Sequence, residues 1–275
     1  MLTALSEYFA TIPSSHRALI LVGGISFFWI WESAVPLFRF GYRKWTHALL
    51  NLFFTATTIV VNFGLAFLLL QAADWAVANR VGVLFLLPVD ALWLQLVVGL
   101  LVLDLISAWL AHWVQHKTHP LWRLHLIHHS DTHIDTTSAN RHHPGESVVR
   151  FVFTTAGVLV VGAPMWMVLL YQAVSVVLSQ FNHANIMLPP ALDRVLSWVI
   201  VSPDMHKVHH HYVLPYTDSN YGNVFSVWDR LFGTFMSLER AQLTYGIDSH
   251  MDPKEHSTVG ALLTMPFRPY RKPAA

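Results

Sequence analysis

Long runs of apolar residues, broken by short polar segments, fill the first two thirds of the chain. A helix that crosses a bilayer needs about 20 mostly apolar residues. The runs at 18–38, 48–73 and 91–113 have this length, and those at 148–161 and 164–181 approach it. The pattern predicts an all-α membrane bundle of about four to five helices.

The last two apolar runs are separated only by a helix-breaking segment. Gly162 and Pro164 lie between them, so we expect a helical hairpin over about 148–181 rather than one long helix. Each half is short for a span, which leaves a shallow or re-entrant hairpin open. From Pro189 onward the chain is more polar and includes an amphipathic stretch at 192–201. We expect this part to form a helical cap on the cytosolic side.

The basic residues of the short loops predict the orientation, since cytosolic loops carry the excess of Lys and Arg. Only Arg17 precedes the first run, and only Arg80 lies between the second and third. The other two loops carry Arg39, Arg43 and Lys44, and Lys117, Arg123, Arg141 and Arg150. We therefore expect a multi-pass protein with its N-terminus outside and the segment after 113 on the cytoplasmic side. The C-terminal residues show no lysine-type retrieval signal, which favours a bacterial inner membrane over the endoplasmic reticulum.

The composition agrees with a membrane protein and excludes several other classes. Of the 275 residues, 54% are hydrophobic and 12% are charged, roughly half the charged share of a soluble domain. A net charge of +1 offers no broad basic surface for nucleic acid. The chain has no cysteine, which excludes disulfides, iron–sulfur clusters and thiolate zinc sites.

Histidine is the unusual residue of this chain. There are 18 histidines, and 14 of them lie between His112 and His211. Several recur at spacings of three and four, which place side chains on neighbouring parts of one helical face. These are His112 and His116, then His125, His128 and His129, then His206, His209 and His210, with His183 between the clusters.

Nine histidines so arranged predict metal binding, because desolvated imidazoles beside a bilayer need partners and a metal satisfies several together. A single HxxxH pair is weak evidence and is often a surface accident, but two HxxHH motifs with an HxxxH are specific. Nine ligands exceed what one ion takes, so we expect two metals with four or five imidazoles each. Imidazole suits zinc, copper, iron and nickel, so the spacing leaves the metal open. A pH-sensing cluster is the remaining non-metal interpretation.

The residues alone admit more than one function for such a site. A histidine-rich membrane metal transporter or sensor is one alternative, although transport ligands usually lie near mid-span. A zinc-dependent membrane hydrolase is another, although its typical HExxH motif is absent from the sequence. A coupled dicopper oxygen site also uses helical histidines.

Beyond the histidines, a longer series of motifs resembles the fatty acid hydroxylase and sterol desaturase superfamily of membrane non-haem diiron enzymes. The series runs from Asp104 to about Thr234, just under half the chain. It comprises Asp104, Trp109, His112-x-x-x-His116, Leu121-Trp122-Arg123-Leu124-His125-x-x-His128-His129-Ser130, Thr137, Arg141-x-His143-Pro144-x-Glu146, His183-x-Asn185, Pro203-x-x-His206-x-x-His209-His210, Asp218-x-Asn220-Tyr221-Gly222 and Trp228-Asp229-Arg230-Leu231-Phe232-Gly233-Thr234.

The resemblance implies an O2-dependent enzyme with two iron ions that hydroxylates or desaturates a lipid, with the nine histidines as ligands. Zinc could replace iron in purified protein. It also implies N-terminal membrane helices at 1–100, a catalytic domain at 101–240 that includes the hairpin, and a tail at 241–275. Turnover needs two electrons, and since we find no nucleotide, flavin or haem motif we expect an external donor, a small redox protein with its reductase. The lipid, the reacting carbon and the oligomeric state stay open.

Further polar residues of the matching stretch are candidates for orienting the ligands. His143 is expected to be either a ligand or a residue that holds one. The other candidates are Asp104, Glu146, Asn185, Asp204, Asp218 and Asp229, with Arg141 and Arg230 as partners for these carboxylates. We interpret the surplus histidines His119, His133, His142 and His211 as surface residues or contacts to lipid head groups.

Overall fold

The computed structural model describes residues 1–88 and 91–272, and within them the chain forms helices joined by turns, with isolated bridges but no strand. The first half contains α1 (Leu2–Ala10), α2 (Ser14–Ala34), α3 (Lys44–Ala78), α4 (Leu92–Asp104), α5 (Ala111–Lys117) and α6 (His119–His129). The second half contains α7 (Pro144–Val161), α8 (Met165–His183), α9 (Pro190–Leu196), α10 (Pro203–His209), α11 (Val227–Leu231), α12 (Pro253–His256) and α13 (Val259–Thr264). The predicted all-α class is confirmed.

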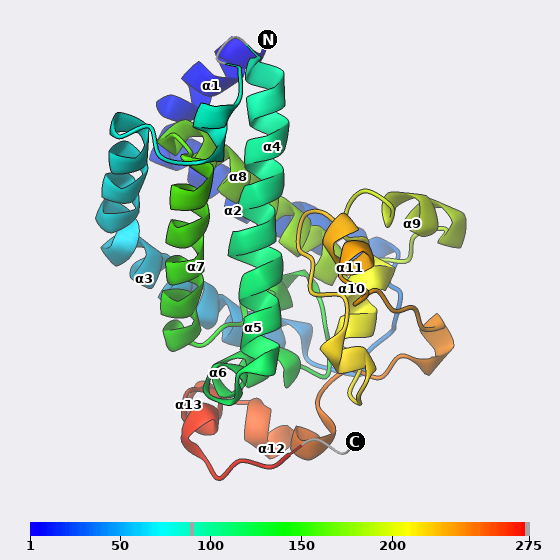
Figure 1. Ribbon diagram of the computed structural model, residues 1–275. Helices are drawn as coiled ribbons and strands as arrows, with labels where there is room; N and C mark the ends of the chain where they lie inside the picture. Colours follow the sequence, from blue (N-terminus) through cyan, green and yellow to red (C-terminus); the bar gives the residue numbers. More distant parts are fainter. Residues whose placement is uncertain (89–90, 273–275) are drawn as a thin grey trace.

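Five helical segments are long and apolar enough to cross a membrane, as the sequence predicts. They are Ser14–Ala34, Lys44–Leu86, Leu92–Lys117, Pro144–Val161 and Met165–His183. Figure 1 shows α4 and α7 side by side, with α3 flanking α7 and with α8 crossing obliquely behind α4. Their packed core includes Leu69, Leu103, Val158 and Met167.

The first span ends four residues before the apolar run does. The sequence predicts helix to Phe38, but α2 ends at Ala34 and Val35 has φ −134°. A residue before proline is disfavoured in the α region because the proline ring clashes with it. Pro36 therefore fixes the end of this helix.

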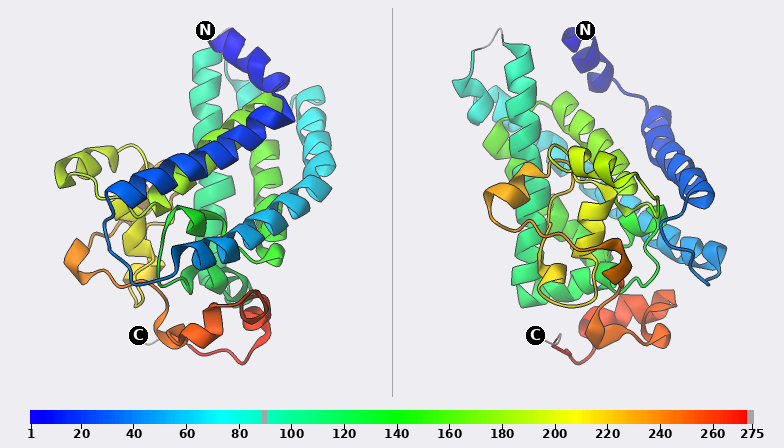
Figure 2. Two further views of the ribbon diagram at one scale, coloured as in Figure 1. Left: turned by 180° about the vertical axis from the view of Figure 1, so that it is seen from behind. Right: turned by 90° about the vertical axis from the view of Figure 1, so that its right-hand side faces the viewer.

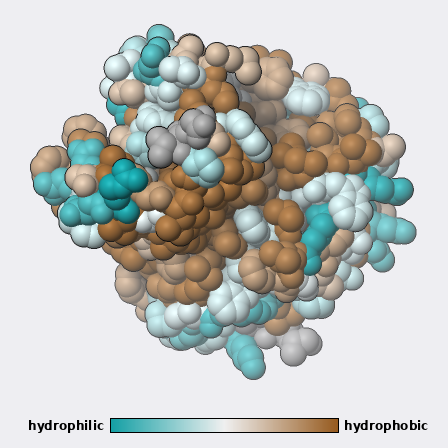
Figure 3. Space-filling view, turned by 45° about the horizontal axis from the view of Figure 1, so that its top comes forward, coloured by the Kyte–Doolittle hydropathy of each residue, from teal (hydrophilic) through white to brown (hydrophobic). Residues whose placement is uncertain are grey.

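The outward faces of α2 and α3 carry the apolar side chains that a lipid environment requires. Ile30 is 69% exposed and Phe63 is 84% exposed, and both lie on candidate spans. Figure 3 shows hydrophobic groups covering much of the face formed by the upper ends of the helices, with hydrophilic groups at its margins.

The third span is continuous but irregular. Between α4 and α5 lies one π-helical turn, η2 (Leu105–Leu110). Such turns are rare in proteins, but those that occur are frequently found at functional sites. Gly157 of α7 packs directly on η2, since a Cβ there would lie 2.6 Å from Ser107 Oγ. The two elements can therefore approach more closely than ordinary helices.

Two separate helices, α7 and α8, occupy the segment predicted to be a hairpin, and they are separated at Gly162, which has φ +74°. This left-handed conformation favours glycine, and Pro164 precedes the start of α8. The prediction of a break at these two residues is confirmed.

The segments that follow α8 form the cap, with α9, α10 and α11 beside the third span and α12 and α13 at its lower end, whereas α1 lies at the other end of the spans (Figure 1). The 3₁₀ turns η3 (Thr136–Asn140), η4 (Tyr216–Asp218), η5 (Arg240–Gln242), η6 (Asp248–His250) and η7 (Met265–Phe267) connect the short helices, and η1 (Val83–Leu86) follows α3. The segment interpreted as a tail folds back onto α6, because Ile247 and Leu262 are buried with Trp122 and Ile127. Figures 1 and 2 show α12 and α13 beneath α6.

Candidate metal centre

The nine histidines predicted from spacing meet at the junction of the spans and the cap. They come from α5, α6, the end of α8, and α10 with the residue after it. The five-histidine group consists of His112, His116, His125, His129 and His209, and the four-histidine group consists of His128, His183, His206 and His210. Within each group, one ring nitrogen from every residue lies within 4.8 Å of the others. Each group therefore has the donor set of a metal site.

The two HxxHH motifs divide their histidines between the groups. In α6, His125 and His129 belong to the five-histidine group, whereas His128 belongs to the four-histidine group. In the second motif, His206 and His210 share one group and His209 faces the other. Residues four apart differ by about 40° around a helix, and the residue next to them by about 100°. Each motif thus contributes ligands to both groups.

Ring nitrogens within each group face one another at short range. His112 Nε2 lies 3.0 Å from His125 Nε2, and His183 Nε2 lies 3.1 Å from Nε2 of both His128 and His206. Such distances suit nitrogens that share one small cation, because metal–imidazole bonds are about 2.0–2.1 Å long.

Hydrogen bonds on the other side of two rings show which nitrogens carry lone pairs. His112 Nδ1 donates to the Tyr221 carbonyl oxygen at 2.8 Å, and His125 Nδ1 donates to Glu146 Oε1 at 2.9 Å. These oxygens only accept hydrogen bonds, so in both rings Nδ1 carries the hydrogen. The Nε2 atom of each neutral ring therefore carries a lone pair. Two lone pairs 3.0 Å apart repel unless a cation lies between them. The arrangement fits a metal ion.

Five of the histidines outside the spans have lowered pKa values, which favour the neutral form that binds metals. Burial lowers the pKa of His206 and His210 well below its usual value, and neighbouring imidazoles lower it further. The same causes act on His128 and His129, and burial lowers the pKa of His209 to about 3.

Several ring nitrogens in these groups have no hydrogen-bond partner among the described residues. They include His116 Nε2, both nitrogens of His129, and His209 Nε2. Buried polar atoms without partners are costly and rare. A metal ion in the five-histidine group would satisfy the three residues together.

Three predicted partners of the ligands lie where they can hold them. Glu146 accepts from His125 at 2.9 Å and lies 3.1 Å from His142 Nδ1. Asp229 accepts from the Tyr221 backbone N–H at 2.8 Å, so it fixes the residue whose carbonyl binds His112. Asp218 Oδ1 lies 3.8 Å from His116 Nδ1.

Other candidates do not touch the nine histidines but connect parts of the scaffold. Asp104 accepts from Tyr171, from the Phe225 backbone N–H and from Trp228. Asn185 pairs with the backbone of Phe38 on both sides of its amide, at 3.0 and 2.8 Å.

The two arginines and Asp204 also lie apart from these histidines. Arg141 donates to the backbone carbonyl oxygens of Ile127 and His256. Arg230 lies over the rings of Trp198 and Phe235, and Asp204 pairs with Arg240. None of the expected pairings of Arg141 or Arg230 with a candidate carboxylate is present among the described residues.

The structure exchanges the roles expected for two adjacent histidines. His143 precedes α7 and accepts the Gly145 N–H on Nδ1 at 3.0 Å, so it caps the helix and lies outside both groups. His142, expected at the surface, is buried with its ring centre 4.6 Å from that of His128. In the sequence, the position of His142 four residues before Glu146 is the signal that indicates this inward orientation.

The other surplus histidines differ from one another. His119 is exposed, as expected, and contacts Tyr270. His133 stacks on Tyr42. The surface interpretation is wrong for His211, which is buried.

A buried acidic pair, Asp131 and Asp135, was not predicted from the sequence and holds the loop after α6. His47 of α3 binds Asp131 at 2.9 Å and Asp135 at 3.0 Å. Burial raises the pKa of Asp131, but the charges of His47 and Arg141 outweigh this and hold it well below its usual value. The network ties the loop between His129 and His142 to a membrane helix.

A narrow pocket of about 30 Å³ adjoins both histidine groups. Its lining residues come from η2, α5, α6, η3, the loop before α7, α7, α8, α10 and the segment after η4. They are Ala108, His112, His125, His128, Ala139, His142, Arg150, Ser179, His183, His206, Tyr221, Gly222 and Asn223. Both candidate metal sites thus border one space.

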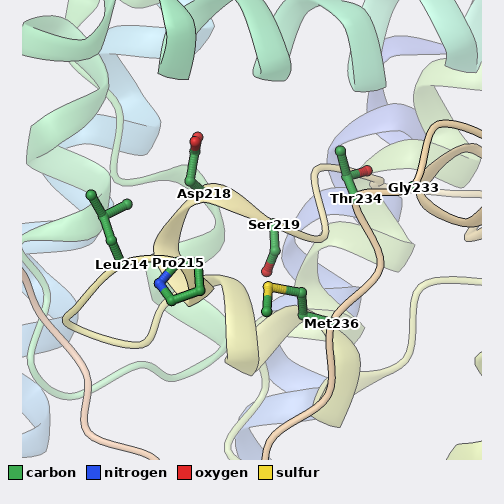
Figure 4. A pocket seen from close by; sticks show the side chains of 7 residues that line it. All are labelled: Leu214, Pro215, Asp218, Ser219, Gly233, Thr234 and Met236. Atoms are coloured by element: carbon green, nitrogen blue, oxygen red, sulfur yellow. The ribbon is translucent and has the colours of Figure 1, made fainter. Parts of the chain in front are cut away.

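A second, larger pocket of about 280 Å³ lies on the cap and contains none of the nine histidines. Ser219 and Met236 point toward one another across it, and the Asp218 carboxylate points away from them (Figure 4). The Ser219 carbonyl accepts from His209 Nδ1 at 2.6 Å. The wall of this pocket therefore contacts a histidine of the five-histidine group.

Together these features define a class: an all-helical protein with candidate membrane spans and two adjoining histidine groups suited to metal ions. The family model described as fatty acid hydroxylase matches residues 96–234, just over half of the chain. The chain belongs to the fatty acid hydroxylase family.

Curated relatives share this part of the chain. An ornithine lipid hydroxylase, OlsE, of Rhizobium tropici is 30% identical over 151 residues, which are 54% of this chain and 44% of that protein. Alkylglycerol monooxygenases of Xenopus tropicalis and Homo sapiens are 28% identical over 143 and 171 residues, or 50% and 60% of this chain and 29% and 35% of theirs. The match thus spans less than half the length of these relatives. No solved structure matches the chain.

Proposed function

We propose that the protein is an O2-dependent diiron membrane oxidoreductase that hydroxylates or desaturates a lipid. The observation that carries this proposal is that both histidine groups line one pocket beside candidate spans. Family membership supports it, and relatives are named as a lipid hydroxylase and as monooxygenases of alkylglycerols.

The nine histidines would hold two irons, five imidazoles at one and four at the other. When bound, the iron pair supplies the chemistry that activates O2 for attack on an unactivated C–H bond. The chain's own part is to hold the ligands in place. The Tyr221 and Ser219 carbonyls and the Glu146 carboxylate fix the rings of His112, His209 and His125 by accepting their Nδ1 protons.

The substrate would enter from the bilayer. Ala108, Arg150 and Ser179 line the pocket and belong to three candidate spans. A lipid that slides between these helices brings its chain to the histidines without crossing water. Burial of the surrounding side chains keeps water from the reacting carbon.

The remaining expectations concern the setting of the enzyme. We place the site on the cytoplasmic side of a multi-pass protein, in a bacterial inner membrane rather than the endoplasmic reticulum. An external small redox protein with its reductase would deliver the two electrons. Residues 101–240 would form the catalytic domain, with membrane helices before it and the α12–α13 segment covering α6.

The decisive experiment combines metal analysis with a lipid assay on protein purified in lipid nanodiscs. We expect about two irons per chain. With a redox partner, a reductant and isotopically labelled O2, we expect lipids that gain one labelled oxygen or lose two hydrogens. Bound zinc or copper alone, with no lipid product after iron loading, would contradict the proposal. It would then favour a hydrolase, a copper protein or a transporter.

A further inference from the structure

Arg150 has a position that its role as a loop charge does not explain. It lies four residues after Glu146 on α7, so the two side chains share a helical face about 6 Å apart along the axis. Its side chain is 38% exposed and lines the pocket that adjoins both histidine groups. Of the described residues on that pocket wall, it is the one arginine or lysine.

The guanidinium of Arg150 makes one long ion pair and, among the described residues, no hydrogen bond. Its nearest carboxylate oxygen, Glu146 Oε1, lies 3.9 Å away and already contacts His125 and His142. Among the described residues, we find no hydrogen bond from the five guanidinium N–H groups. A charge within a membrane segment is expensive, and such residues are functional by default. The arginine is therefore free to bind an incoming group.

The surroundings of Arg150 leave room for a ligand oxygen. Ala108 on the π-helical turn has a small side chain, and Ser179 and Asn223 add neutral polar groups to the wall. Asn223 Nδ2 is already bound to Ser175 Oγ at 2.8 Å. Arg150 thus supplies the fixed positive charge of the pocket, about one helical turn after Glu146, the residue that holds His125.

We propose that Arg150 binds an anionic oxygen, a carboxylate or a phosphate, of the lipid substrate. This inference rests on the proposed lipid oxidation and narrows its substrate to an anionic lipid. Because Arg150 lies one helical turn from the residue that holds His125, the reacting carbon would lie close to the head group rather than far along the chain. Arginine suits this role because its planar fork matches carboxylate and phosphate oxygens.

Binding without turnover tests the proposal directly. The holoprotein in nanodiscs of neutral lipid, without reductant, is titrated with a fluorescent polyene fatty acid and with its methyl ester, using energy transfer from tryptophan. We expect Arg150→Gln to weaken binding of the acid by about 10–100-fold, which is the effect of losing one charge-assisted hydrogen bond. The affinity for the methyl ester should change by less than about twofold. Arg150→Lys should fall between. A lysophosphatidic acid competitor shows whether phosphate is accepted as well.

Arg80→Gln is the matched control, since it removes an exposed arginine that lies over Phe85, away from the pocket. The proposal is overturned if Arg150→Gln binds acid and ester as the wild type does, or weakens both equally. Loss of metal with an unchanged acid preference would instead make Arg150 a partner of Glu146. If acid binding depends on Arg150 but no lipid is oxidised, the proposed function fails and the anion site stands.

Discussion

The two histidine groups differ in how their rings are held. In the five-histidine group, His112, His125 and His209 each donate from Nδ1 to a fixed oxygen of the protein. In the four-histidine group, His183 alone has such a partner among the described residues, the Ser179 carbonyl at 2.7 Å. The Nδ1 atoms of its other members, His128, His206 and His210, are buried without one.

The protein itself therefore orients the rings of the five-histidine group, whereas most rings of the four-histidine group depend on a bound metal for their orientation. A hydrogen-bonded imidazole has a fixed tautomer and ring orientation, and its basicity as a ligand is raised. Two carboxylates, Glu146 and Asp218, also lie beside the five-histidine group. We therefore expect this group to bind its metal more tightly and to keep its shape when the metal is removed.

The largest expected effect is the loss of one ligand from either group. His209→Ala and His128→Ala remove one ligand from each group in turn. Both should reduce lipid oxidation by more than about 100-fold, beyond the effect of residues that only orient ligands. Mass spectrometry of lipids and metal analysis are the measurements.

His119→Ala is the control for these variants, because His119 is exposed and lies outside both groups. It should keep wild-type activity. Near-normal turnover in His128→Ala or His209→Ala would show that the assignment of ligands is wrong.

The next effect tests the carboxylate that holds His125. Glu146→Gln replaces the carboxylate that accepts the Nδ1 proton of His125 by an amide. We expect metal affinity of the five-histidine group or activity to fall by about 10–100-fold. A competition titration with a chelator measures it, and unchanged affinity would remove the contrast between the groups.

Metal removal should separate the groups in time. With a chelator in excess, we expect the metal of the four-histidine group to leave about 10-fold faster than the other, because three of its rings have no outer partner. Mössbauer spectra of the iron protein during chelation would resolve the two phases. A single phase, or earlier loss from the five-histidine group, would reverse the comparison.

The gathering of the nine histidines into two groups is predictable because its signal is local. Spacings of three and four on a helix are set by helix geometry. Hydropathy predicts the five spans for a similar reason, since span length depends on bilayer thickness. The π-helical turn at Leu105–Leu110 has no comparable signal in the sequence.

The partners that hold the ligands are not local, and many are backbone atoms. The Tyr221 carbonyl lies 109 residues from His112, and no side chain marks it. The spacing of four before Glu146 marks His142, whereas no spacing marks His143 as the residue that caps α7 and lies outside both groups. Glu146 was predicted because its carboxylate is itself the partner.

Asp104→Asn has the smallest expected effect on the metals and sharpens the comparison from outside the site. Asp104 Oδ2 accepts from the Phe225 N–H at 3.0 Å and from Trp228 Nε1 at 3.0 Å, and no described ligand histidine contacts it. An asparagine has only one side-chain oxygen. Its amide N–H₂ group would therefore face either the Tyr171 hydroxyl or the two N–H donors, and at least one of these hydrogen bonds would be lost. We expect the free energy of unfolding to fall by about 1–3 kcal/mol, with unchanged metal content in the folded fraction. Thermal unfolding and metal analysis check this, and metal loss at full stability would place Asp104 among the residues that hold the ligands.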